Sequence, residues 1–261
     1  MNVDPHEVLW PDVPFRLHEV LILAGLRGSE AHGTYVPPSD PHGVDDRDIM
    51  GVCVLPREYY LGLDRWEHAE SIKECWDVAL YDVRKFVGLL CQQNPNVLSL
   101  LWLEPEDYVV QTPAGRYLVD CRAVFRHRKH AFDSFMGYAT GQLKRMTSFG
   151  QFRGYMGAKR KALVERFGWD TKNGAHLIRL LHMGHEYLTT GELRVRRRED
   201  VPHLLAIKRG EVALADVQAE AEEFFRKCHD AYDTSPLPSE LDRQAVNRVL
   251  LSIFADRWRQ T

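Results

Sequence analysis

Two short stretches carry side chains whose types and spacing could do chemistry. Gly28-Ser29 follows the apolar run 20–26, and Asp46 and Asp48 come directly before the apolar run 49–55. A turn after a strand leaves backbone N–H groups and a hydroxyl pointing outward, and glycine lets a phosphate approach the main chain closely. Because side chains alternate along a strand, two acids at i and i+2 share one face. The sequence therefore predicts a phosphate cradle beside two carboxylates that can hold Mg²⁺, or Mn²⁺.

A third carboxylate would complete such a site, since two-metal phosphoryl transfer uses acids around ions about 3.5–4 Å apart. We predict Asp77, because in the stretch 71–80 it is set among Trp76, Val78 and Leu80, where an unpaired charge is costly without a metal or a partner. Glu74 and Asp82 remain alternatives. An ion pair between Asp77 and an arginine would explain the residue structurally, and a solvated turn would explain the acidic pair.

A group of basic side chains stands in the second half of the chain. Lys172, His176 and Arg179 recur at i, i+4 and i+7 in a stretch with helical periodicity, so they project from one helix face. Such a face is most often the solvated side of a helix. The pairs His127/His130 and His182/His185 have a spacing that can hold a metal, which leaves a phosphohydrolase as a more distant hypothesis.

The charge of the 261-residue chain is distributed unevenly. Residues 1–125 hold 10 Lys and Arg against 20 Asp and Glu, whereas residues 126–210 hold 18 basic against 7 acidic side chains. A basic stretch of this kind faces phosphates, nucleic acid or its own acidic partner domain.

The remaining composition indicates a folded protein of the cytoplasm. No apolar run approaches the roughly 18 residues of a membrane span, and the first ten residues contain acids where a signal peptide has basic residues. The five cysteines stand far apart without a Cys-x-x-Cys pair, which is typical of reduced thiols. We therefore expect cytoplasmic localisation and no contact with a membrane.

The elements that must position these residues follow from periodicity. The first half has strand-like stretches at 20–26, 49–55 and 71–80, and a helix that begins near Asp82, which is suited to its N-cap. From residue 129 onward the pattern is helical, which predicts two structural units. The predicted helices cover residues 129–147, 155–167, 173–190, 211–232 and 238–259.

The order of these motifs resembles a known superfamily. Gly-Ser, then Asp-x-Asp at the start of a second strand, then an isolated Asp on a third strand, is similar to the nucleotidyltransferase superfamily that includes DNA polymerase β. The closer resemblance is to the bacterial and phage predicted nucleotidyltransferases, some of which are encoded with RNA ligases. Supporting motifs lie at residues 81–86, 94–98, 170–180 and 207–211.

The resemblance implies an α+β fold, in which a mixed-sheet catalytic domain (residues 1–125) precedes a helical nucleotide- and acceptor-binding domain (residues 126–261). It implies metal-dependent transfer of a nucleoside monophosphate from an NTP to an acceptor, with release of pyrophosphate. The implied catalytic and metal-binding residues are Asp46, Asp48 and Asp77, and the implied nucleotide-binding residues are Gly28, Ser29, Lys172, His176 and Arg179.

An RNA end is the favoured acceptor because of the basic stretch, with a protein hydroxyl or a small metabolite as alternatives. The alternative function is a catalytically silent nucleotide- or RNA-binding module of the same fold. The sequence does not decide which NTP is used or the oligomeric state.

Overall fold

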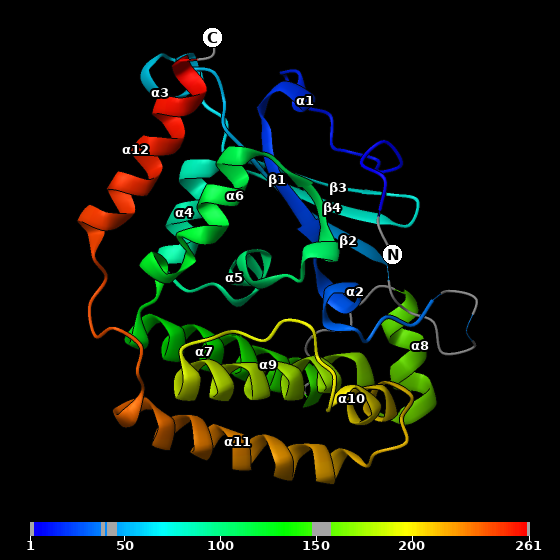
Figure 1. Ribbon diagram of the computed structural model, residues 1–261. Coiled ribbons are helices and arrows are strands. Elements are labelled where there is room, and N and C mark those ends of the chain that lie inside the picture. The colour runs from blue at the N-terminus through cyan, green and yellow to red at the C-terminus, as the bar shows by residue number, and fades with distance from the viewer. Residues whose placement is uncertain (1–2, 38–39, 41–45, 148–157, 260–261) are drawn as a thin grey trace. The chain divides into compact units, whose positions relative to one another are not determined.

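The computed structural model describes residues 3–37, 40, 46–147 and 158–259 (Figure 1). The chain divides into two compact units. The sheet unit comprises Met1–His32, Asp46–His127 and Glu240–Thr261, and the helical unit comprises Gly33–Asp45 and Arg128–Ser239.

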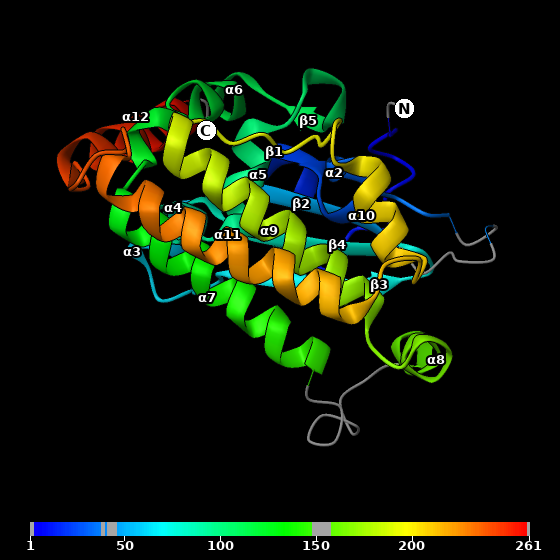
Figure 2. The same ribbon diagram turned by 90° about the horizontal axis from the view of Figure 1, so that it is seen from below.

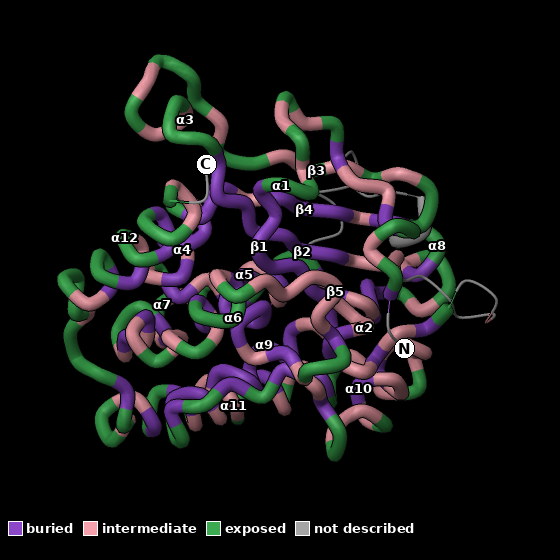
Figure 3. Tube along the Cα trace, turned by 45° about the horizontal axis from the view of Figure 1, so that its top comes forward, coloured by how far each residue is buried: buried purple, intermediate pink, exposed green. Residues whose placement is uncertain are grey.

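The sheet unit is built on a five-stranded sheet with the order β3-β4-β2-β1-β5. Only β2 and β4 pair in parallel among the described strands, so the sheet is mixed. Figure 3 shows buried residues along β1, β2 and β4, and all six residues of β1 are buried. The strands are β1 (Leu21–Leu26), β2 (Arg47–Cys53), β3 (His68–Lys73), β4 (Trp76–Asp82) and β5 (Tyr108–Gln111).

Helices pack around this sheet. The predicted N-cap at Asp82 is confirmed, since its carboxylate accepts hydrogen bonds from the backbone N–H groups of Arg84 and Lys85, both at 3.1 Å. The α-helices are α1 (Leu17–Val20), α2 (Gly28–His32), α3 (Glu58–Leu61), α4 (Val83–Cys91), α5 (Pro95–Ser99), α6 (Pro113–Asp120) and α12 (Arg243–Arg259). Short 3₁₀ turns cover Leu100–Trp102, Pro105–Asp107 and Arg122–Phe125.

The prediction of a single strand over residues 71–80 is wrong. It spans the hairpin of β3 and β4, whose turn contains Glu74 at φ 55°. Glutamate seldom adopts this left-handed conformation, and the turn has no Gly, Asn or Pro to announce it. The alternation of apolar residues therefore continued through a reversal of the chain. Strand β5 was also missing from the predicted elements.

The helical unit consists of α7 (Arg128–Thr147), α8 (Ala158–Phe167), α9 (Thr171–Thr190), α10 (Val201–Lys208) and α11 (Leu214–Thr234). Helix α9 packs against α7, α10 and α11 and is the central helix of the unit (Figure 2). It begins at the N-cap Asp170 and ends at Gly191, at φ 75°. Apart from α10, these helices match predicted segments. Across the residues with described structure, we find no helix of the length and hydropathy that a membrane span requires.

The two units differ from the predicted division at residue 125 in two respects, since Gly33–Asp45 belongs to the helical unit and the C-terminal segment belongs to the sheet unit. Helix α12 belongs to the sheet unit, where Phe254 and Trp258 pack their rings on Tyr60. The indole N–H of Trp258 also donates to the carbonyl of Leu55, at 3.5 Å. Periodicity shows that a helix buries one face, but it does not show which unit covers that face.

Candidate active site

The connection from β1 to α2 requires glycine at position 28. Gly28 has φ +60°, and a Cβ built on it would overlap Oδ2 of Asp48 and lie 2.8 Å from its Cγ. The backbone N–H of Arg27 donates to the carbonyl of Asp48, at 2.9 Å. The end of β1 is therefore fastened to the start of β2, with the Asp48 carboxylate directly against the Gly28 main chain.

Ser29 follows in the first turn of α2. Within the described parts of the chain, its Oγ is shielded from solvent and has no hydrogen-bond partner. A shielded hydroxyl without a partner costs about 1–3 kcal/mol, so such groups are rare unless a ligand completes them. A phosphate oxygen is an acceptor to which this hydroxyl can donate, which fits the predicted cradle.

The three predicted carboxylates lie at the same end of two neighbouring strands. Asp46 directly precedes β2, and Asp48 is its second residue, so they share a face. The parallel register of β2 and β4 pairs Asp48 with Asp77. Because paired residues of adjacent strands point to the same side, all three acids belong to one face of the sheet. Each of the three is half-buried.

The Asp77 carboxylate forms the ion pair with an arginine that the sequence analysis gave as its structural explanation, although the sequence did not identify which arginine. Nη2 of Arg27 lies 2.7 Å from Oδ1 of Asp77. In the portion of the chain that is described, no three His, Cys, Asp or Glu side chains are arranged as they would be around a metal ion. The one available signal for Arg27 was its position, because it is the charged residue between an apolar strand and Gly28.

The alternative acids serve other purposes. Asp82 pairs with Cys53, five positions and thus about 16 Å along the strands from the Asp48–Asp77 pair. It caps α4 and accepts a hydrogen bond from the hydroxyl of Tyr60, and burial raises the pKa of Asp82. Glu74 is exposed in the hairpin turn. Of the three candidates, Asp77 is the one that lies opposite Asp48.

The basic trio of α9 is less exposed than a solvated helix face would be. Lys172 and His176 are half-buried, and Arg179 is only 8% exposed. Nη1 of Arg179 donates to Sδ of Met183, at 3.1 Å, and no carboxylate of the described chain forms an ion pair with it. Burial, together with the nearby Arg197, lowers the pKa of Arg179 to about 9. Within the described part of the chain, this guanidinium is a buried cation without a carboxylate in an ion pair.

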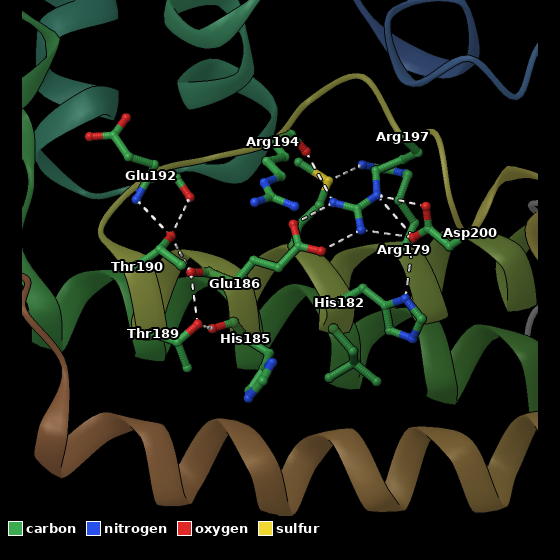
Figure 4. A network of polar contacts seen from close by, with 12 residues as sticks. Arg179, His182, His185, Glu186, Thr189, Thr190, Glu192, Arg194, Arg197 and Asp200 are labelled. Atoms are coloured by element: carbon green, nitrogen blue, oxygen red, sulfur yellow. Dashed lines mark hydrogen bonds and ion pairs between the residues drawn. The ribbon is translucent and has the colours of Figure 1, made fainter.

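The carboxylates near Arg179 are already occupied, as Figure 4 shows. Arg197 donates to both oxygens of Glu186, at 2.7 and 2.6 Å, and to those of Asp200, at 3.1 and 2.9 Å. His182 connects Asp200, at 3.2 Å, to Glu220, at 3.0 Å. His182 is therefore built into an ion-pair network, whereas the His185 ring packs on Phe224. A phosphate would be an available partner for Arg179.

A mixed five-stranded sheet with flanking helices, followed by a helical region, is the architecture expected of a polymerase β-like nucleotidyltransferase, so the predicted fold class is confirmed. The model of the RNA repair pathway DNA polymerase beta family matches residues 16–252, and the chain belongs to this family. The match includes every predicted site residue in both units. A comparison with curated proteins gave no match.

Proposed function

We propose that this protein is a metal-dependent nucleotidyltransferase that transfers a nucleoside monophosphate from an NTP to an acceptor, with an RNA end as the favoured acceptor. The observation that carries the proposal is the contact between the acidic face and the cradle. The Asp48 carboxylate lies against Gly28, beside the unpartnered hydroxyl of Ser29 in the described structure.

Asp46, Asp48 and Asp77 would hold Mg²⁺ or Mn²⁺. Carboxylate oxygens are the ligands that these ions prefer, and the three acids belong to one face of the sheet. A bound metal supplies charge neutralisation of the triphosphate and lowers the pKa of the attacking hydroxyl.

The chain's own polar groups would bind and orient the nucleotide. The Ser29 hydroxyl would donate a hydrogen bond to a phosphate oxygen, and the absence of a side chain at Gly28 would allow the phosphate to approach. Lys172, His176 and Arg179 would bind nucleotide phosphates, with the two permanent cations stabilising charge on the leaving group. The acceptor oxygen forms a bond to the α-phosphorus, the bond from that phosphorus to the bridging oxygen breaks, and pyrophosphate leaves. The acceptor proton passes to solvent.

Two observations support RNA as the acceptor. The family to which the chain belongs carries RNA repair in its description. The helical unit also presents exposed basic side chains on α7 and α8, which can follow a phosphate backbone. These are Lys144, Arg145, Lys161 and Arg166; the side chains of their neighbours Lys159 and Arg160 lie outside the described residues.

The test is pyrophosphate release by Asp46→Ala and Asp48→Ala, measured together with thermal unfolding. We expect both variants to lose turnover and to fold, because each acid is only half-buried at the start of β2. Asp64→Ala removes an exposed acid from the same unit and serves as the matched control, with turnover unchanged. Turnover at the wild-type rate in either site variant would exclude these acids from the mechanism.

The second candidate function is a silent nucleotide- or RNA-binding module. The observation that favours it is the ion pair between Asp77 and Arg27, which gives Asp77 a structural partner. A silent module binds NTP in calorimetry without releasing pyrophosphate and tolerates Asp77→Asn. An enzyme loses turnover with the same substitution.

A further inference from the structure

Arg27 occupies the junction between the cradle and the acidic face. Its backbone N–H is bound to the Asp48 carbonyl, and its Nη2 contacts Oδ1 of Asp77 at 2.7 Å. Its Nε is shielded from solvent and has no hydrogen-bond partner among the described residues. One arginine therefore lies between Gly28 and the carboxylate that faces Asp48.

The guanidinium is held loosely for an arginine in this position. It makes a single contact to Asp77, where an arginine–carboxylate pair can form two parallel hydrogen bonds. The side chains of Arg27 and Asp77 are 22% and 32% exposed, so solvent also weakens the pair. Partly exposed pairs of this kind change an equilibrium constant by up to about fivefold, which a divalent ion can overcome.

A second arginine at the same edge shows what a fixed structural role looks like. Nε of Arg47 lies 3.2 and 3.3 Å from the two carboxylate oxygens of Glu30, and its guanidinium stacks 4.5 Å from the centre of the Trp76 ring. Arg47 thus has both a carboxylate and an aromatic partner. Arg27 has one contact and a shielded N–H without a partner.

We propose that Arg27 is the built-in counter-cation of Asp77, a positioning residue that a divalent ion must displace before Asp46, Asp48 and Asp77 can bind that ion together. This inference rests on the function proposed above. Arg27 directly precedes Gly28 and Ser29 in the chain. A displaced guanidinium can therefore form an ion pair with an NTP phosphate bound at these residues. Arg27 therefore weakens metal binding in the absence of nucleotide and couples metal binding to nucleotide binding.

The experiment is a titration of the full-length protein with Mn²⁺ alone, in which electron paramagnetic resonance measures free Mn²⁺. Arg27→Gln removes the competing cation and should bind Mn²⁺ about three- to fivefold more tightly than the wild type. Arg27→Lys keeps the charge and should stay within about twofold. Arg47→Gln, which removes an equal charge that does not contact Asp77, controls for long-range electrostatics and should also stay within about twofold.

A second measurement isolates the pair. In an Asp77→Asn background, Arg27→Gln should leave Mn²⁺ affinity unchanged, because the displaced contact is already absent. On the unmodified protein, Mg²⁺ should shift the Arg27 Nε–H resonance, identified by its loss in Arg27→Lys, so the proposal is testable even if Arg27→Gln does not fold.

Unchanged or weaker Mn²⁺ binding by folded Arg27→Gln, an equal gain in Arg47→Gln, or an Arg27 resonance insensitive to Mg²⁺ would overturn the inference and leave the proposed function standing. If the wild type binds no Mn²⁺, or if Asp48→Ala does not abolish the binding, both the inference and the proposed function are overturned.

Discussion

Gly28→Ala tests the contact on which the candidate site depends. At φ +60° an alanine costs about 1–2 kcal/mol relative to glycine, because its Cβ crowds the following carbonyl oxygen. The added Cβ also overlaps Oδ2 of Asp48, so that carboxylate must rotate away from the cradle. We expect a lower unfolding temperature, by about 2–4 °C for each kcal/mol, together with loss of Mn²⁺ binding and of pyrophosphate release.

Gly168→Ala separates the two effects. Gly168 has φ +78°, and in the described structure a Cβ there meets no heavy atom within 4 Å. This control therefore carries the same kind of backbone cost without displacing a functional group. Thermal unfolding should shift similarly in both variants, while metal binding and turnover should fall only in Gly28→Ala. Wild-type Mn²⁺ affinity in folded Gly28→Ala would show that the position of the Asp48 carboxylate does not matter, and would refute the reasoning.

Three further predictions concern the helical unit. Arg179→Met removes a buried cation at similar volume, so calorimetry should show about tenfold weaker NTP binding while the free energy of unfolding without nucleotide rises; equal NTP affinity would remove Arg179 from the site. Although burial opposes it, hydrogen bonding to Asp200 and Glu220 raises the pKa of His182, so that stability is full below the unfolded pKa near 6.5 and is lost as pH rises through the folded pKa. His182→Gln should flatten this pH dependence in chemical unfolding. Binding of single-stranded RNA should weaken with salt, with a logarithmic slope of about 0.7 per phosphate contacted, and Lys161→Glu should reduce that slope; no binding at low salt would favour a protein or small-molecule acceptor.

The parts of the site that could be predicted from the sequence are local in the chain. The i, i+2 spacing of Asp46 and Asp48 fixes their common face as soon as β2 forms, and the structure has this strand. Glycine before Ser29 indicated a main-chain turn open to a ligand, and the positive φ of Gly28 gives the physical reason. In both cases the geometry follows from neighbouring residues alone.

The parts that could not be predicted depend on distant pairing. Arg27 and Asp77 are 50 residues apart, and only the register of β4 beside β2 brings them into contact. The hairpin turn at Glu74 has no turn-forming residue, so the pattern suggested one strand through it. Which unit covers α12 is likewise a matter of tertiary packing, which hydrophobic periodicity does not encode.

Helix α9 differs most clearly from what its sequence pattern suggests. Its basic residues at helical spacing are typical of a solvated face, but in the structure they are buried or half-buried. Charged residues at helical spacing are solvated when a helix packs on one side, but α9 is surrounded by α7, α10 and α11. Arg179 is therefore buried, while Arg197 and His182 take the nearby carboxylates. Burying an unpaired cation is unfavourable, and so is shielding the Ser29 hydroxyl without a partner in the described chain. Both groups would bind phosphate, and both were predicted to bind nucleotide from the sequence alone. Each group has an energetic cost that a phosphate would relieve within its own unit. The measurement is the rise in unfolding temperature with NTP, tested separately in Ser29→Ala and Arg179→Met; a rise unchanged in one variant would exclude that group from nucleotide binding.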